Sequence, residues 1–141
     1  MKPNMIVMSH GMLAAEVVAS AQMIVGELEG IYAIGLLPSD SLADITARLE
    51  SCPPMIDSES PVIIMADLGG GTPSNVALQA MLTRANTRLL TGFNLSMVVA
   101  YAVSEERNLD ELAGELRTTG VDAIQIIEKP TVAIEEDGYE D

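Results

Sequence analysis

Residues 5–11 read MIVMSHG, and this stretch decides the fold. An apolar run ends in Ser9, His10 and Gly11, and apolar residues at helical spacing follow from Leu13 onward. This order is typical of a buried strand that passes through a short turn into a helix. His10 is the only histidine of the chain. Because ligands bind beyond the carboxyl ends of the strands in open α/β sheets, we expect His10 to lie at a functional site.

The same arrangement occurs a second time around residue 67. An apolar run over residues 61–66 ends in Asp67, and the following residues read LGGGTPSN. If the two strands are neighbours, the imidazole of His10 and the carboxylate of Asp67 meet above the sheet. The carboxylate would then accept the N–H of one ring nitrogen and leave the other nitrogen free to act as a nucleophile.

The turn after Asp67 is suited to an anion. Successive backbone N–H groups at the start of a helix can hold phosphoryl oxygens, and hydroxyl groups can add further donors. We therefore predict His10 and Asp67 as catalytic residues, and as phosphate-binding residues Gly69, Gly70, Gly71, Thr72 and Ser74. Each residue also has a plainer interpretation, because a lone histidine is often structural and consecutive glycines can form only a tight turn. These residues indicate a site suited to phosphoryl transfer without choosing it over other chemistries.

Strand and helix patterns alternate along the rest of the chain, which predicts an α/β fold with a mainly parallel sheet. Strands are expected at 4–9, 31–36, 62–66, 89–92 and 124–127. Helices are expected after Leu13, after a Ser41 cap, after a Thr72 cap with Pro73 in the first helical position, and at 95–103 and 109–118. Residues 52–60, which are rich in Pro and Ser, are expected to form a loop.

The composition limits the classes of protein to consider. The 141 residues favour one domain, expected over 1–130, with an acidic, disordered tail over 131–141. The chain has 21 acidic and 7 basic residues and a formal net charge of −14, which disfavours nucleic-acid binding. Cys52 is the single cysteine, so an intrachain disulfide is excluded, and the sequence predicts neither a metal site nor a cofactor. With no signal-peptide pattern and no apolar stretch of the ~20 residues that span a bilayer, a cytoplasmic protein is expected.

Two motifs at matching separation resemble the enzyme IIA domain of the mannose family, in the bacterial phosphoenolpyruvate-dependent sugar phosphotransferase system. They are IVMSHG at 6–11, followed by Leu13-Ala14, and DLGGGTPSN at 67–75. The resemblance extends over about residues 4–128. It implies an open three-layer sandwich with strand order 2-1-3-4, which places His10 and Asp67 on adjacent strands. Leu68 stands where the family usually has an aromatic residue, a change that could alter the rim that meets the IIB component.

The resemblance also implies what these residues do. The histidine that matches His10 accepts a phosphoryl group from the carrier protein HPr and passes it to a IIB component, which phosphorylates the incoming sugar. The aspartate that matches Asp67 hydrogen-bonds the histidine ring. The membrane components IIC and IID are indirect partners, so the protein is expected either free in the cytoplasm or at the membrane periphery. The family forms homodimers in which a C-terminal strand packs onto the partner's sheet, and residues 124–127 are the segment that would do this.

Three alternatives remain to be weighed. A receiver domain phosphorylated on Asp67 needs an acidic pair after the first strand to hold magnesium, and Ser9-His10 stands there instead. A chelatase-type enzyme needs further metal-binding side chains, and the sequence has no second histidine. A phosphorylation-sensing regulatory module of the same fold, cut from a larger regulator, is the main alternative. No DNA-binding or ATPase segment is present in these 141 residues, which favours the transport component.

Overall fold

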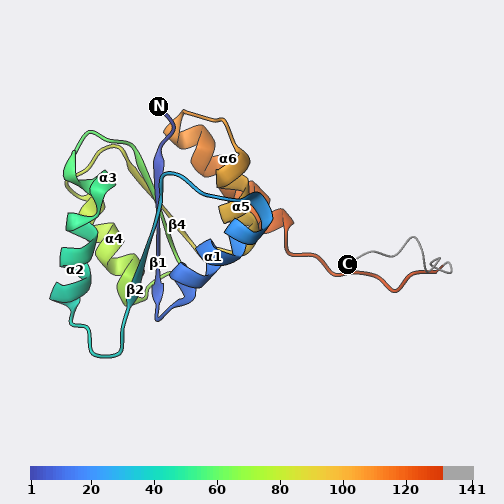
Figure 1. The fold of residues 1–141 in the computed structure, drawn as a ribbon, viewed down its shortest axis with the longest axis horizontal. Coiled ribbons are helices and arrows are strands. Elements are labelled where there is room, and N and C mark those ends of the chain that lie inside the picture. Colours follow the sequence, from blue (N-terminus) through green and yellow to red (C-terminus); the bar gives the residue numbers. More distant parts are fainter. Residues whose placement is uncertain (132–141) are drawn as a thin grey trace.

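The computed structural model describes residues 1–131 and contains a parallel sheet at its centre. The strands of this described part lie in the order β2-β1-β3-β4, and all their neighbouring pairs are parallel (Figure 1). Their bounds are β1 Asn4–His10, β2 Ile31–Leu36, β3 Val62–Ala66 and β4 Thr87–Thr91. The expected fold class and strand order are thereby confirmed.

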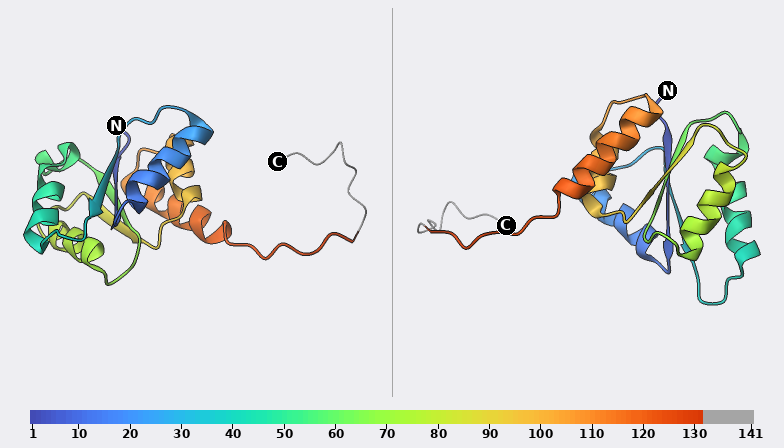
Figure 2. Two further views of the ribbon diagram at one scale, coloured as in Figure 1. Left: turned by 60° about the horizontal axis from the view of Figure 1, so that its bottom comes forward. Right: turned by 180° about the vertical axis from the view of Figure 1, so that it is seen from behind.

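Helices cover both faces of the sheet, which gives the expected three layers (Figures 1 and 2). One face carries α1 (Leu13–Val25), α5 (Leu95–Val103) and α6 (Leu109–Asp122). The other face carries α2 (Leu42–Ser51), the short α3 (Pro53–Ile56) and α4 (Thr72–Met81). The helix α3 lies within the segment 52–60 that was expected to be a loop, and it begins with two prolines, which favour the first turn of a helix.

The central strands are buried on both faces, which explains their continuous apolar sequence. Along β1, Met5 and Val7 pack into the core under α1, α5 and α6, whereas Ile6 and Met8 pack into the core under α2 and α4. Every residue of β3 is buried. The strand β1, which ends in His10, and the strand β3, which ends just before Asp67, are therefore held in place by packing on both faces of the sheet.

The starts of three helices show how the local sequence directs the fold. Ser41 forms a full capping box, because its Oγ accepts the Asp44 N–H at 3.1 Å and the Asp44 carboxylate accepts the Ser41 N–H at 2.8 Å. Asn108 accepts the N–H of Glu111 at 2.9 Å, as its place before α6 predicts. The helix α4 begins one residue earlier than expected, with Gly71 as the N-cap and Thr72 already helical.

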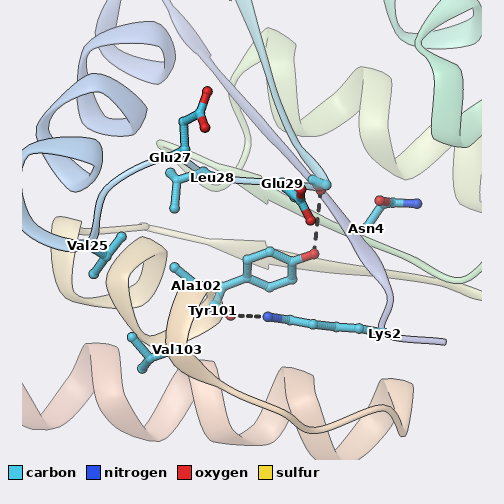
Figure 3. A pocket seen from close by; sticks show the side chains of 10 residues that line it. Lys2, Asn4, Val25, Glu27, Leu28, Glu29, Tyr101, Ala102 and Val103 are labelled. Carbon is cyan, nitrogen blue, oxygen red and sulfur yellow. Dashed lines mark hydrogen bonds between the residues drawn. The ribbon is translucent and has the colours of Figure 1, made fainter.

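The amino end of the sheet contains a small polar pocket (Figure 3). The hydroxyl of Tyr101, from α5, donates to the carbonyl of Pro3, and the Lys2 ammonium lies 4.2 Å from the centre of the Tyr101 ring. Lys2 also donates to the carbonyl of Tyr101. These contacts tie the N-terminal residues to α5, at the end of β1 opposite to His10.

The C-terminal part departs from expectation. Helix α6 runs to Asp122 rather than 118, and residues 124–127 form no strand in the described chain. A strand needs a hydrogen-bonded neighbour, and this segment extends away from the sheet instead (Figure 1). Ile124, Ile126 and Ile127 are 80%, 91% and 80% exposed. Most of the tail expected at 131–141 lies outside the described residues. No helix within 1–131 is long and apolar enough to span a bilayer.

Candidate functional site

The site lies at the carboxyl edge of the sheet, where β1 and β3 end side by side. His10 is the last residue of β1, and Asp67 directly follows Ala66, the last residue of β3. The Asp67 N–H continues the ladder between these strands by donating to the carbonyl of Met8 at 3.2 Å. Because adjacent parallel strands end at the same edge, the two side chains meet although 57 positions separate them in the sequence.

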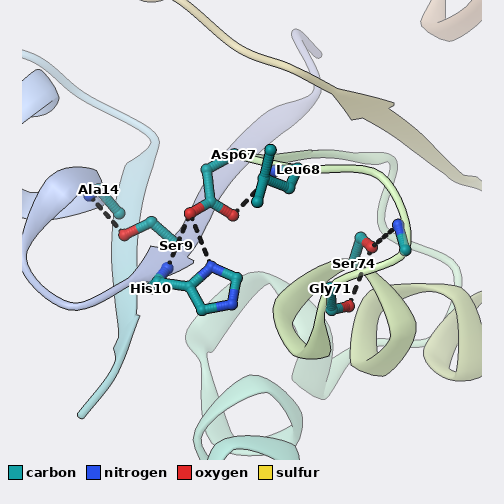
Figure 4. Close-up of polar contacts among 8 residues, drawn as sticks. Ser9, His10, Ala14, Asp67, Leu68, Gly71 and Ser74 are labelled. Atoms are coloured by element: carbon teal, nitrogen blue, oxygen red, sulfur yellow. Dashed lines mark hydrogen bonds and ion pairs between the residues drawn. The ribbon is translucent and has the colours of Figure 1, made fainter. Parts of the chain in front are cut away.

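The Asp67 carboxylate holds the His10 ring and is itself held in place (Figure 4). Its Oδ2 lies 2.9 Å from Nδ1 of His10 and accepts the backbone N–H of His10, also at 2.9 Å. Its Oδ1 accepts the N–H of Leu68 at 2.9 Å. The side chain of His10 is 48% exposed and that of Asp67 only 10%. The carboxylate is thus a fixed acceptor for a ring that is about half exposed.

The charge state of Asp67 decides which ring nitrogen carries the proton. Burial by itself raises the pKa of Asp67, but the hydrogen bonds from the His10 backbone, the His10 ring and the Leu68 backbone together hold this pKa below its usual value. An ionised carboxylate can only accept hydrogen bonds, so Nδ1 must donate and carry the proton. In the neutral ring, Nε2 then keeps a free lone pair.

The turn between β1 and α1 is held by residues that the sequence analysis did not single out. The buried Ser9 accepts the N–H of Ala14 through its Oγ at 2.7 Å, which fixes the start of α1 just behind His10. A Cβ at Gly35 would lie 2.2 Å from the carbonyl oxygen of Gly11, so only glycine fits in β2 at that point. A glycine inside a strand often marks such a close backbone approach, and this was the available signal.

The glycine-rich turn divides into parts with different surroundings. The N–H of Gly70 donates to Ser74 Oγ at 3.0 Å, and the Ser74 hydroxyl donates to the carbonyl of Gly71 at 3.1 Å. Gly69 lies beside Thr91, at the end of β4, whereas Gly71 lies against the His10 ring. Thr72 provides the first helical residue of α4. Of the predicted phosphate-binding residues, Gly71 therefore lies against the His10 ring, whereas Gly70 and Ser74 are hydrogen-bonded to each other.

Comparison with known proteins then decides the family. Residues 4–116 match the model of the family described as the PTS system fructose IIA component, EIIA-man. The chain belongs to this family. Among solved structures it is similar to the mannose/sorbose specific IIA subunit of the phosphotransferase system from Enterococcus faecalis. Identity is 41%, the similarity covers 94% of this chain and 100% of the other, and the TM-score is 0.88.

Two curated relatives have a lower sequence identity to the present chain. The sorbose-specific EIIA component of Klebsiella pneumoniae is 26% identical over 91% of this chain and 94% of its own length. The mannose-specific EIIAB component of Escherichia coli K12 is 23% identical over 88% of this chain but only 39% of its own length. The chain therefore spans about two fifths of the latter protein.

The chemistry available at this IIA site follows from its parts. A neutral imidazole with Nδ1–H bound to a carboxylate is a nucleophile at Nε2, and the carboxylate stabilises the positive charge that develops on the ring during attack. The nearby first turn of α4 has N–H groups without intrahelical partners and a positive dipole end, which favours an anion. Within residues 1–131 no group of three or more His, Cys, Asp or Glu residues could hold a metal ion.

Proposed function

We propose that this IIA protein is a phosphoryl carrier in sugar uptake, in which His10 accepts a phosphoryl group from phospho-HPr and passes it to a IIB component that phosphorylates the incoming sugar. The observation that carries this proposal is the 2.9 Å contact between Nδ1 of His10 and Oδ2 of Asp67, which leaves Nε2 directed away from the carboxylate. Membership of the family supports a role in sugar phosphotransfer.

The transfer is a displacement at phosphorus between two imidazoles. The lone pair of His10 Nε2 attacks the phosphorus of the donor's phosphohistidine, and a new N–P bond forms as the donor's N–P bond breaks. The donor imidazole leaves with the electron pair of the broken bond. The proton on Nδ1 of His10 stays in place, and Asp67 stabilises the charge that develops on the ring. Transfer to the IIB component repeats these events with His10 as the leaving group.

The turn would stabilise the charge on the phosphoryl oxygens. In this proposal the backbone N–H groups of Gly69, Gly71 and Thr72 bind the oxygens, with the Thr72 hydroxyl as a further donor. Gly70 and Ser74 join them only if the hydrogen bond between these two residues opens. The aliphatic Leu68 is 60% exposed beside the site, so the partner proteins would contact it.

Phosphorylation of the whole protein tests this function. We expect incubation with phosphoenolpyruvate, enzyme I and HPr to add one phosphoryl group, measured by intact mass, with the acid lability and base stability of a phosphoramidate. The His10→Ala variant should gain none. A His10→Ala protein that is still phosphorylated would contradict the proposal. Subsequent loss of the group to a IIB component supports the transport role, whereas a stable phosphoprotein that IIB cannot discharge supports a regulatory module.

We further propose that the protein acts as a homodimer. The support is the exposed Ile124, Ile126 and Ile127, together with β4, which is an edge strand of the described sheet. Pairing of residues 124–127 with a second copy would cover both the apolar side chains and the strand edge. Sedimentation at micromolar concentration should give twice the chain mass of 14.9 kDa. Ile126→Lys should shift the protein to monomers, and a wild-type monomer would contradict strand exchange.

A further inference from the structure

The His10 ring lies between a carboxylate and a glycine. Asp67 contacts the ring at Nδ1, and Gly71 lies next to the edge formed by Cε1 and Nε2 (Figure 4). A Cβ placed on Gly71 would lie 2.9 Å from Cε1 and 3.5 Å from Nε2 of His10. The first distance is shorter than a carbon–carbon contact allows, because such contacts are optimal at roughly 3.5–4.0 Å. The ring therefore occupies space that any other residue at position 71 would fill.

The backbone gives no reason for glycine at this position. Gly71 has φ −84° and ψ 170°, an extended conformation that every residue adopts. Its neighbour Gly70 differs, since its φ of +83° lies in the region that favours glycine. The helix-capping role of Gly71 would also be served well by serine, aspartate or asparagine. What distinguishes glycine at position 71 is the missing side chain next to the imidazole.

We propose that Gly71 is a positioning residue for phosphoryl transfer. Its missing Cβ leaves the space in which the His10 ring keeps Nδ1 on Asp67 and Nε2 accessible at the first turn of α4. This inference rests on the proposed function of His10 and adds a steric requirement to it. A methyl group 3.5 Å from Nε2 would be in van der Waals contact with the attacking nitrogen, so no other atom fits between them.

The site also predicts how an added methyl group would be accommodated. The atoms it meets belong to the end of a side chain that is 48% exposed, so the ring can turn toward solvent while the backbone stays in place. Gly35 provides the contrast, because a Cβ there would meet the backbone oxygen of Gly11, which cannot move alone. Substitution of Gly71 should therefore disturb the ring far more than the fold.

The test compares Gly71→Ala with Gly114→Ala. Gly114 is exposed in α6, and a Cβ there meets nothing within 4 Å, so it adds the same methyl group away from the site. Phosphorylation of His10 is measured with phospho-HPr and with potassium phosphoramidate, a small donor that needs no docking surface. We expect Gly71→Ala to slow both reactions roughly 10–100-fold, as misplacement of a reacting group does, with the KM for phospho-HPr little changed. Gly114→Ala should match the wild type.

NMR of the single imidazole provides a second readout. In Gly71→Ala we expect the Nδ1 and Nε2 signals to move toward those of a ring that exchanges between tautomers, because the Asp67 contact is lost. If wild-type rates and wild-type ring signals persist in Gly71→Ala, the inference is wrong while the carrier function stands. If neither donor phosphorylates the wild type, the proposed function itself fails.

A double-mutant cycle covers the case in which Gly71→Ala lowers stability. If the methyl group acts through the ring, its effect on the unfolding midpoint should disappear in a His10→Ala background, where the ring is absent. An effect of equal size in both backgrounds would show that the methyl group acts on the backbone, and would overturn the proposal.

Discussion

Polar side chains gather at both ends of β1, but their hydrogen bonds differ. At the carboxyl end, the His10 ring is bound at Nδ1, and its Nε2 has no partner among residues 1–131. At the amino end, the Tyr101 hydroxyl is buried and donates to the carbonyl of Pro3. The Lys2 ammonium beside it donates to a carbonyl and lies over the Tyr101 ring. The two regions are roughly 20 Å apart along the strand.

We infer that this difference separates the proposed reactive site from a structural one. At the amino-end pocket, the Lys2 ammonium and the Tyr101 hydroxyl both already donate to backbone carbonyls. The carboxyl end combines a fixed acceptor, a ring nitrogen without a partner among residues 1–131 and the start of a helix. The unused hydrogen-bonding capacity of His10 Nε2 therefore distinguishes the carboxyl end from the amino end. Changes at the carboxyl end should alter transfer rates, whereas changes at the amino end should alter only stability.

The largest effect is expected for Asp67→Asn. The amide oxygen can still accept from Nδ1, but the charge that stabilises the reacting ring is lost. We expect phosphoryl transfer from phospho-HPr to slow by ~10²–10⁴-fold, measured by rapid quench. The fold should persist, at a cost of about 1 kcal/mol, because the amide N–H₂ then faces the Leu68 N–H, which loses its acceptor.

Two observations together would contradict this role of Asp67. They are an unchanged transfer rate and unchanged ring nitrogen signals of His10 in the variant. Asp110→Asn is a matched control, because Asp110 also has a lowered pKa, through its hydrogen bond and charge pairing with Arg88, but lies on α6. Its transfer rate should equal that of the wild type.

The strands and the turn after Asp67 differ in how well the sequence predicts them. The bounds predicted for β2 and β3 agree with the structure, because their apolar runs are delimited by glycine, proline and a charged residue. The strand ends made the meeting of His10 and Asp67 a conditional prediction, and the strand order implied by the family resemblance placed them on adjacent strands. The pairing of Gly70 with Ser74, and the space beside Gly71, could not be predicted, because they depend on the path of a turn.

The segment 124–127 shows another limit of sequence patterns. Its apolar residues favour a strand, but a strand forms only beside a neighbour, and no segment within residues 1–131 pairs with it. The sequence pattern predicts that α6 ends at residue 118, before its actual end at Asp122, for a related reason. Gly120, near that end, packs against Met97 of α5, a tertiary contact that the helix pattern does not contain.

An effect of intermediate size is expected on the unfolding free energy at acidic pH. The pKa of Asp67 is lower in the folded protein than in the unfolded chain, so its charge contributes stability that is fully present above the unfolded pKa. This contribution begins to be lost as the pH falls below about 4, the pKa of an aspartate in an unfolded chain. It is lost completely once the pH falls below the pKa of Asp67 in the folded protein. The difference in unfolding free energy between wild type and Asp67→Asn should therefore shrink between pH 7 and pH 3, as measured by urea denaturation. A difference that is independent of pH would contradict the charged state assigned to Asp67.

The smallest effect is expected at the amino end, for Tyr101→Phe. Burial, followed by the nearby Tyr32, raises the pKa of Tyr101 to about 12, so its hydroxyl remains a donor at all working pH values. Removal of the hydroxyl leaves the carbonyl of Pro3 without this donor, and should lower the unfolding free energy by roughly 1–2 kcal/mol. Tyr32→Phe is the matched control, because the Tyr32 hydroxyl makes no hydrogen bond to a described residue, and its stability should change little.

The decisive measurement on Tyr101→Phe is the transfer rate rather than the stability. With the hydroxyl gone, the ring still packs in the core and the Lys2 ammonium can still lie over it, so β1 should keep its place up to His10. We expect the rate of transfer from phospho-HPr to equal that of the wild type at temperatures well below the unfolding midpoint. A clear loss of rate in a folded Tyr101→Phe protein would mean that the two ends of β1 are coupled. The amino-end pocket would then contribute to phosphoryl transfer and not only to the stability of the fold.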